Sequence, residues 1–462
     1  MNSQLLFILL AIYVVFLLAG LSCLIRAVIG RKKIRPPLCR QRTEAPQPPL
    51  QFGASTEPAR SQGCRLRRSK ALIWFGLGAV LLGMLGVWSL RLALYHERQP
   101  VAEWSDGRAP ALEPLIRKRC VPFMEQGRSI GLAVAIVTPT NTTIMAFGRA
   151  SLASGAGTRG DTLFEIGSIT KTFTGLALAR EIERGTLRLD QPLQELLPPG
   201  VVLPAAARGV TLQQLATHSS GFPRMPARWS LLRGVGMLLF GSDPYVGYTE
   251  ADLLEDVSTV KVRSKPGTKS NYSNFGMVLL GHLLAAKAGL SYETLVQREI
   301  CLPLAMNDTT VTIEPAQASR VAQGYRAVLR CGPALLVLPS DPWFANNPLG
   351  GAGALRSTAT DMLAYLLANM RPEGSPLEPA LRASHRELFR ENSRSALGMN
   401  WFRTRNRQLR QTLIWHNGAT GGFRSFIGFT EDSRFGVLIL SNSTVGVDGL
   451  AVALLRDLAR SH

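Results

Sequence analysis

The stretch FEIGSITKTFT, residues Phe164–Thr174, decides how the rest of the chain is interpreted. Ser168 and Lys171 stand three residues apart, before an apolar run, Phe173–Leu178, that predicts a helix. Because positions i and i+3 share a helix face, we expect the Lys171 amine beside the Ser168 hydroxyl. A serine needs an adjacent base to become a nucleophile, and a lysine of lowered pKa can be that base. The pattern predicts a nucleophile and its base. The alternative is that Ser168 is an ordinary helix N-cap without a catalytic role.

Two short motifs farther along the chain carry further candidate residues. Tyr272-Ser-Asn274 precedes a long helical run, where the Tyr272 hydroxyl could exchange a proton with a lysine and Asn274 could offer its amide to a substrate carbonyl. Both residue types are also common at caps and turns. His218 lies in a polar turn, and we favour a turn-stabilising histidine over a catalytic base. His416-Asn-Gly418 follows a strand-like segment.

The order of predicted elements indicates an α+β fold. Strands are expected near both ends of the C-terminal 360 or so residues, with helices between them. The connections 138–141 and 431–434 are short enough for antiparallel hairpins. We therefore predict an antiparallel sheet flanked by helices, with a mostly helical subdomain inserted. The Pro-rich stretch Pro315–Leu349 is expected to be irregular.

Two apolar runs, Leu5–Ile25 and Ala71–Leu90, are each long enough to cross a bilayer as a helix. The Arg- and Lys-rich segment between them is expected in the cytoplasm by the positive-inside rule. The predicted organisation is multi-pass: transmembrane helix 1 in residues 1–30, a basic cytoplasmic loop in 31–70, transmembrane helix 2 in 71–92, and an extracytoplasmic domain in 101–462. A cleaved signal peptide is the alternative for the first run.

The net charge of +20 does not indicate nucleic-acid binding once it is mapped along the chain. Residues 26–70 hold twelve Lys and Arg against two acids, which is half of the excess. No alternation of aromatic and basic residues suited to reading bases is present. Membrane lipids are the expected partners of the N-terminal segments. The spacing of Cys120, Cys301 and Cys331 fits no metal motif, so structural thiols are expected, with one disulfide left open.

The motifs together resemble the serine β-lactamase and penicillin-binding-protein superfamily. The resemblance is to the class C-like branch, with D-alanyl-D-alanine carboxypeptidases, D-aminopeptidases and related esterases. It extends from about residue 112 to 455, and it is carried by six ordered stretches: Ser168-Ile-Thr-Lys171, Leu215-Ala-Thr-His-Ser-Ser-Gly221, Tyr272-Ser-Asn274, Pro303-Leu-Ala-Met306, Leu355-Arg-Ser-Thr-Ala-Thr-Asp361 and His416-Asn-Gly418.

The resemblance implies a role for each motif residue. Ser168 would form an acyl-enzyme, with Lys171 and Tyr272 sharing the proton transfers. Asn274 would hold a side amide of the substrate. The oxyanion hole would be the backbone N–H groups of Ser168 and of Ala419, on an edge strand.

The third motif departs from the β-lactamases of this branch, because His416 stands where they carry lysine, ahead of Gly418. A mostly neutral histidine offers less charge to a substrate carboxylate. We therefore expect inefficient β-lactam hydrolysis, and tighter binding of carboxylate substrates as the pH falls toward 6.

The expected function is that of a membrane-anchored serine hydrolase without metal or cofactor. Its substrates would be small peptides, esters or β-lactams, with a D-amino-acid peptidase or an esterase favoured. The alternative is a penicillin-binding sensor or scaffold that turns over slowly or not at all.

Overall fold

The computed structural model describes residues 101–226, 242–331, 334–343 and 350–461, together with Gly78 and Gly236. The chain divides into two compact units, Met1–Gln99 and Pro100–His462. The predicted segments 1–30, 31–70 and 71–92 therefore lie outside the described residues, apart from Gly78. Among the helices that are described, none is by itself long and apolar enough to cross a bilayer; one bent pair, Asn274–Ala288 with Tyr292–Cys301, meets that test only as a pair.

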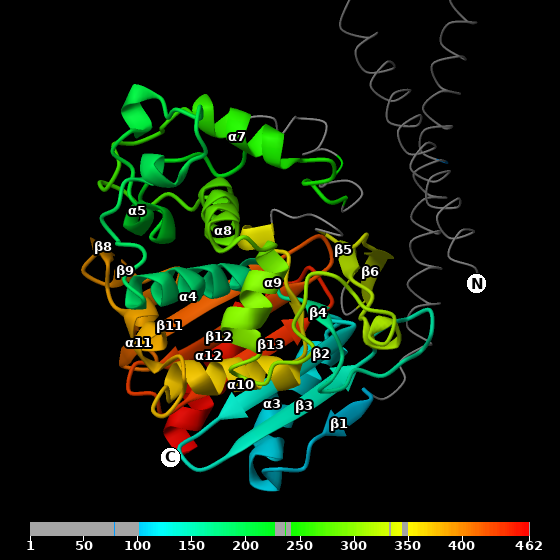
Figure 1. Ribbon diagram of the computed structural model, residues 1–462. Helices are drawn as coiled ribbons and strands as arrows, with labels where there is room; N and C mark the ends of the chain where they lie inside the picture. Colours follow the sequence, from blue (N-terminus) through cyan, green and yellow to red (C-terminus); the bar gives the residue numbers. More distant parts are fainter. Residues whose placement is uncertain are drawn as a thin grey trace, which may run out of the picture. The chain divides into compact units, whose positions relative to one another are not determined.

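A nine-stranded antiparallel sheet runs through the C-terminal unit (Figure 1). The strand order is β1-β3-β2-β13-β12-β11-β10-β9-β8, so strands from both ends of the unit lie side by side, as predicted. The strands are β1 (Glu103–Ser105), β2 (Gly131–Val137), β3 (Thr142–Gly148), β8 (Phe389–Asn392), β9 (Ser395–Leu397), β10 (Phe402–Asn406), β11 (Gln411–Ala419), β12 (Arg424–Thr430) and β13 (Gly436–Ser441).

Helices cover both faces of this sheet because its central strands are apolar on both sides. In β13, Val437 and Ile439 belong to one buried cluster, whereas Leu438 and Leu440 belong to another, as the two-residue period of a strand requires. On one face lie α3 (Glu113–Glu125) and α12 (Asp448–Ser461). On the other lie α4 (Thr170–Glu183), α10 (Ala359–Met370) and α11 (Glu378–His385).

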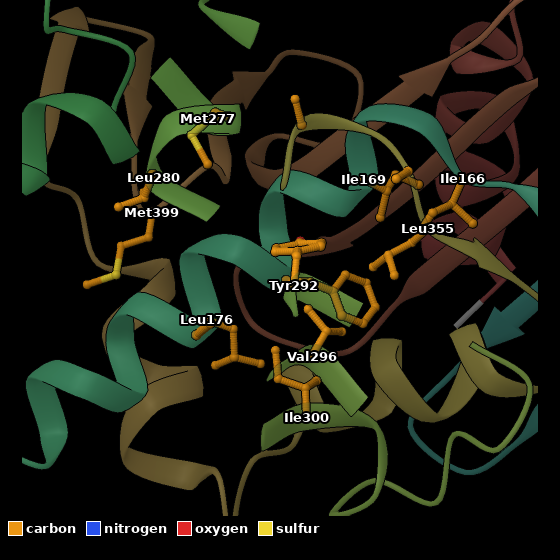
Figure 2. Close-up of a cluster of buried hydrophobic side chains, with 14 of the residues drawn as sticks. Ile166, Ile169, Leu176, Met277, Leu280, Tyr292, Val296, Ile300, Leu355 and Met399 are labelled. Atoms are coloured by element: carbon orange, nitrogen blue, oxygen red, sulfur yellow. The ribbon is translucent and has the colours of Figure 1, made fainter. Parts of the chain in front are cut away.

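A mostly helical part lies on the side of α4 away from the sheet (Figure 1). It contains α5 (Leu212–Ala216), α7 (Glu250–Ser258), α8 (Asn274–Ala288) and α9 (Tyr292–Val296), which continues as a π-helical turn, η5 (Gln297–Cys301). Figure 2 shows the apolar cluster that joins this part to the nucleophile segment; it includes Ile169, Leu176, Met277, Tyr292 and Val296. The segment carrying Ser168 and Lys171 is thus fixed from both sides.

Shorter elements connect these layers. Strands β4 (Phe164–Glu165) and β7 (Arg356–Ser357) pair with each other. Among the described residues, the single 3₁₀ turns are η1 (Pro110–Leu112), η2 (Gly167–Ile169), η3 (Leu193–Leu196), η4 (Ala205–Ala207), η6 (Ala318–Arg320) and η7 (Gly350–Ala352).

One secondary-structure prediction is wrong. The stretch Pro315–Leu349 is not irregular throughout, because β5 (Tyr325–Cys331) and β6 (Ala334–Pro339) pair as an antiparallel hairpin. Its prolines suggested breaks over the whole stretch, whereas Tyr325–Cys331 contains none and is free to pair. Cys120 and Cys301 are buried free thiols, as expected.

The approach of η7 to α8 predicts a stability effect. A Cβ at Gly351 would lie 2.7 Å from the Met277 carbonyl oxygen and 2.9 Å from Gly281 Cα, so Gly351→Ala must push the two segments apart. Overpacking of this kind costs about 1–3 kcal/mol, and we expect a lower thermal midpoint by calorimetry. Gly209→Ala is the matched control, since its Cβ meets nothing within 4 Å. Equal midpoints for the two variants would contradict the close approach.

Candidate active site

Ser168 lies in the tight turn between β4 and α4. The chain enters η2 through Gly167, whose φ of +51° is a left-handed conformation that favours glycine. A Cβ at Gly167 would lie 2.7 Å from the Ala419 amide nitrogen, so this turn sits directly against β11. Helix α4 begins at Thr170, two residues after the serine. Ser168 remains partly exposed and can be reached by a substrate.

Lys171 is fully buried one turn along from Ser168. Its Nζ lies 2.9 Å from Ser168 Oγ and donates a hydrogen bond to the Ala352 carbonyl oxygen at 2.5 Å. Burial, and secondarily the charge of Arg224, holds the pKa of Lys171 well below its ordinary value. The environment therefore favours the neutral amine, which can accept the Ser168 proton.

Tyr272 stands over the same pair of side chains. Its ring centroid lies 5.0 Å from Lys171 Nζ. Burial raises the pKa of Tyr272 to about 12, against the smaller opposing effects of a hydrogen bond with Ser168 and the charge of Arg224. The phenol is therefore protonated at neutral pH and can donate a proton to an atom bound near Ser168.

Two buried histidines lie beside Tyr272, with ring centroids 4.5 Å (His218) and 6.3 Å (His416) from its ring. His416 Nδ1 lies 2.6 Å from the Asn417 carbonyl oxygen. A carbonyl only accepts, so Nδ1 carries the proton and Nε2 presents a lone pair. His218 is the reverse, because its Nδ1 accepts from the Ser273 N–H and its Nε2 keeps the proton. Both Nε2 atoms are buried and unpartnered.

Both histidines are held neutral. Burial, then repulsion from Lys171, lowers the pKa of His416 to about 3, although its hydrogen bond to Asn417 opposes the shift. Burial is also the main cause that lowers the pKa of His218. The expectation that His416 gains charge as the pH falls toward 6 is therefore wrong: it treated the residue as solvated, and its side chain has no exposed surface.

The end of β11 lies open on one side. Strand β10 pairs with β11 only as far as Trp415, whereas β12 pairs with it to Ala419. The resemblance implied that β11 is an edge strand, and this is wrong, because β11 lies between β12 and β10 in the sheet. Residues 416–419 nevertheless have a free edge, and η2 occupies that side. Gly418 permits this approach, since a Cβ there would lie 2.0 Å from the Ile166 carbonyl oxygen. The Ala419 and Ser168 amides are thus brought into the same region, at a helix start where N–H groups lack intrahelical partners.

Asn274 opens α8, directly after Ser273, whose hydroxyl caps the helix by accepting the Gly276 N–H. The Asn274 amide Nδ2 donates to Met225 Sδ at 3.4 Å, which is a weak acceptor. The Oδ1 atom is buried and has no hydrogen-bond partner. The side chain therefore has unused capacity to bind a polar group of a substrate.

The structure thus brings Ser168, Lys171, Tyr272, His416, Gly418 and Ala419 together, with Asn274 at the helix start beside Tyr272. It adds two groups that the sequence did not indicate, Arg224 and the Ala352 carbonyl, and it places His218 in contact with Tyr272. No sequence pattern indicated Arg224, because its position depends on the hydrogen bond that its carbonyl oxygen accepts from the Asn274 N–H. The sequence placed His218 in a polar turn, and the structure agrees, with its φ at +56°. Within the described residues, no three His, Cys, Asp or Glu side chains are grouped to hold a metal ion.

Comparisons with known proteins agree with this geometry. The family model described as Beta-lactamase matches residues 116–460. The D-alanyl-D-alanine-carboxypeptidase/endopeptidase AmpH of Escherichia coli K12 is 25% identical over 76% of this chain and 87% of its own length. A beta-lactamase of the same strain is 25% identical over 72% of this chain and 89% of its own. An unguisins hydrolase of Aspergillus campestris is 26% identical over 71% of this chain and 61% of its own.

A solved structure, the octameric penicillin-binding protein homologue from Pyrococcus abyssi, superposes with a TM-score of 0.61 at 25% identity, covering 75% of this chain and 76% of that one. The chain belongs to the beta-lactamase family. It is a β-lactamase-related serine hydrolase with the α+β fold of that family.

The neutrality of His416 predicts a flat pH response. At pH 6 a group with a pKa of about 3 is protonated in only about one molecule in a thousand. Attraction to a carboxylate would therefore strengthen only as the pH falls toward 3. We expect acetyl-D-alanine to bind the Ser168→Ala protein with a Kd that stays constant between pH 6 and 8, measured by calorimetry. The account would be contradicted if the Kd of acetyl-D-alanine decreases toward pH 6 and His416→Gln abolishes that decrease.

The contact at Gly418 predicts a catalytic effect. Its Cβ in Gly418→Ala would meet the Ile166 carbonyl oxygen and Ser425 Oγ, so η2 must shift relative to β11. A displacement of about 1 Å in an active site can cost about 10²-fold in rate, and we expect a loss of that order in kcat for an activated ester. Gly157→Ala, with no atom within 4 Å of its Cβ, should keep full activity. Unchanged kcat in Gly418→Ala would show that the register of η2 on β11 is unimportant.

Proposed function

We propose that the protein is a membrane-anchored serine hydrolase that acylates Ser168 and releases the acyl group to water. The observation that carries the proposal is the 2.9 Å separation of Ser168 Oγ from the amine of Lys171, a fully buried lysine. A neutral lysine at that distance is a suitable general base. No other residue is needed to activate the serine.

The proposed reaction uses the surrounding groups in turn. Lys171 takes the Ser168 proton as Oγ attacks the substrate carbonyl. The amides of Ser168 and Ala419 stabilise the oxyanion. Tyr272, a phenol with a pKa of about 12, passes a proton to the leaving group. The Lys171 ammonium then gives its proton to the Tyr272 phenolate, so both groups are neutral again. Lys171 next takes a proton from the water that attacks the acyl carbonyl, and this proton passes to Ser168 Oγ as the ester bond breaks, while Asn274 binds a side amide of the acyl group.

The proposed substrates are small peptides or esters, with a D-amino-acid peptidase or esterase activity. The name of the relative AmpH, a D-alanyl-D-alanine-carboxypeptidase/endopeptidase, supports the peptidase activity. His416 is neutral and offers no fixed charge to a carboxylate. This supports substrates whose group beside the third motif is uncharged. Names among the relatives also make a weak β-lactamase activity a reasonable expectation.

Membrane anchoring is proposed from the sequence. Its support is the two apolar runs, Leu5–Ile25 and Ala71–Leu90, and the basic segment between them. On this proposal residues 101–462 face away from the cytoplasm. Protease treatment of intact cells should then degrade residues 101–462; protection of this part would contradict the proposed orientation.

The acyl-enzyme is tested by intact mass. We expect the whole protein, mixed with p-nitrophenyl acetate or with a β-lactam, to gain the mass of the acyl group, and we expect Ser168→Ala to gain none. Loss of the adduct within seconds to minutes would support a hydrolase.

Other outcomes separate the alternatives. An adduct that persists for hours would favour a penicillin-binding sensor. An equal adduct in Ser168→Ala would contradict the assignment of the nucleophile. No adduct with either reagent would favour a scaffold role.

A further inference from the structure

The third-motif position on β11 holds no permanent positive charge. Lys171, His218 and His416 all have lowered pKa values because they are buried. The third-motif position, where a lysine would bind an anion, presents only the lone pair of His416 Nε2. A substrate anion would find no charged partner in His416.

Arg224 supplies a permanent cation beside Tyr272. Its Cζ lies 5.2 Å from the Tyr272 ring centroid, and its charge acts on Lys171, His218 and Tyr272. A guanidinium is a planar cation with several N–H donors. The Arg224 side chain is exposed, and no carboxylate of the described residues forms an ion pair with it. It is therefore free to bind an anion from solution.

The backbone of Arg224 is fixed beside Asn274. Its carbonyl oxygen accepts the Asn274 N–H at 2.9 Å and the Phe275 N–H at 3.2 Å, so it is tied to the first turn of α8. The buried Oδ1 of Asn274 is unpartnered. A bound acyl group that gives an N–H to Asn274 Oδ1 would therefore extend past Arg224, whereas the opposite flank of Ser168 is formed by β11 and His416.

We propose that Arg224 binds an anionic group carried on the acyl portion of the substrate, and so selects acidic acyl groups. This inference rests on the proposed acyl transfer at Ser168. A guanidinium is suited to a carboxylate because its donors match the two oxygens in a fork. Arg224 thereby supplies, from beside the start of α8, a charge that the third motif lacks.

The test compares esters that share a leaving group. We expect the whole protein to hydrolyse p-nitrophenyl hydrogen glutarate with a kcat/KM about tenfold above that for neutral p-nitrophenyl pentanoate, since a hydrogen bond to a charged group is worth about this factor. Loss of the Arg224 charge also acts on Lys171 and Tyr272 and so affects both esters alike. The preference is therefore measured as the ratio of the two kcat/KM values, and Arg224→Ala should bring this ratio to about one. Arg224→Lys should keep part of the preference. The exposed Arg405, on β10, gives the control Arg405→Ala, which should keep all of it.

A second pair of esters tests on which side of the scissile bond the anionic group must lie. In 4-acetoxybenzoate the carboxylate is on the leaving group, and we expect no Arg224-dependent preference for it over its methyl ester. Three results would each overturn the inference. The first is an Arg224-dependent preference for 4-acetoxybenzoate, and the second is an equal loss for the glutarate and pentanoate esters in Arg224→Ala. The third is the absence of any glutarate preference in the unmodified protein. Absence of any Ser168-dependent hydrolysis would instead refute the proposed function, so the two failures are distinguishable.

Discussion

The site depends on burying a lysine without a carboxylate beside it. An ammonium group out of water costs several kcal/mol unless it is paired, and among the described residues no carboxylate pairs with Lys171. The free-energy cost falls on the protonated form, so the neutral amine is favoured. A neighbouring carboxylate would have stabilised the ammonium and left little free amine to accept a proton at neutral pH. The two partners that Lys171 does have, Ser168 Oγ and the Ala352 carbonyl oxygen, are compatible with a neutral amine that accepts from one and donates to the other.

The fold supplies this environment from three separate parts of the chain. The η2 turn rests on the free edge of β11 through contacts that only glycine permits at Gly167 and Gly418. Turn η7 brings Ala352 to Lys171 and packs on α8 through Gly351. Helix α8 begins beside Tyr272, with its first amides bonded to Arg224. The nucleophile therefore lies where sheet and helical part meet, and each side contributes different chemistry.

The sequence predicted the arrangement where a local pattern carried the information. The three-residue spacing of Ser168 and Lys171 predicts their contact, and the strand-like runs near both ends of residues 101–462 with their short connections predict the antiparallel sheet. It could not predict the protonation of His416, which depends on complete burial and on the Asn417 carbonyl. Nor could it predict Arg224, whose place is fixed by hydrogen bonds to a helix 50 residues later. Both depend on tertiary contacts that no neighbouring residue encodes.

The most direct test of this account is the titration of Lys171 itself. The whole protein would be labelled with [¹³Cε]lysine, and the Lys171 signal assigned by its loss in Lys171→Arg among the nine lysines of the chain. The account predicts that this signal titrates well below the ordinary lysine pKa of about 10.4. A Lys171 that titrates at or above that value would be an ammonium at neutral pH, and would contradict its role as the base for Ser168.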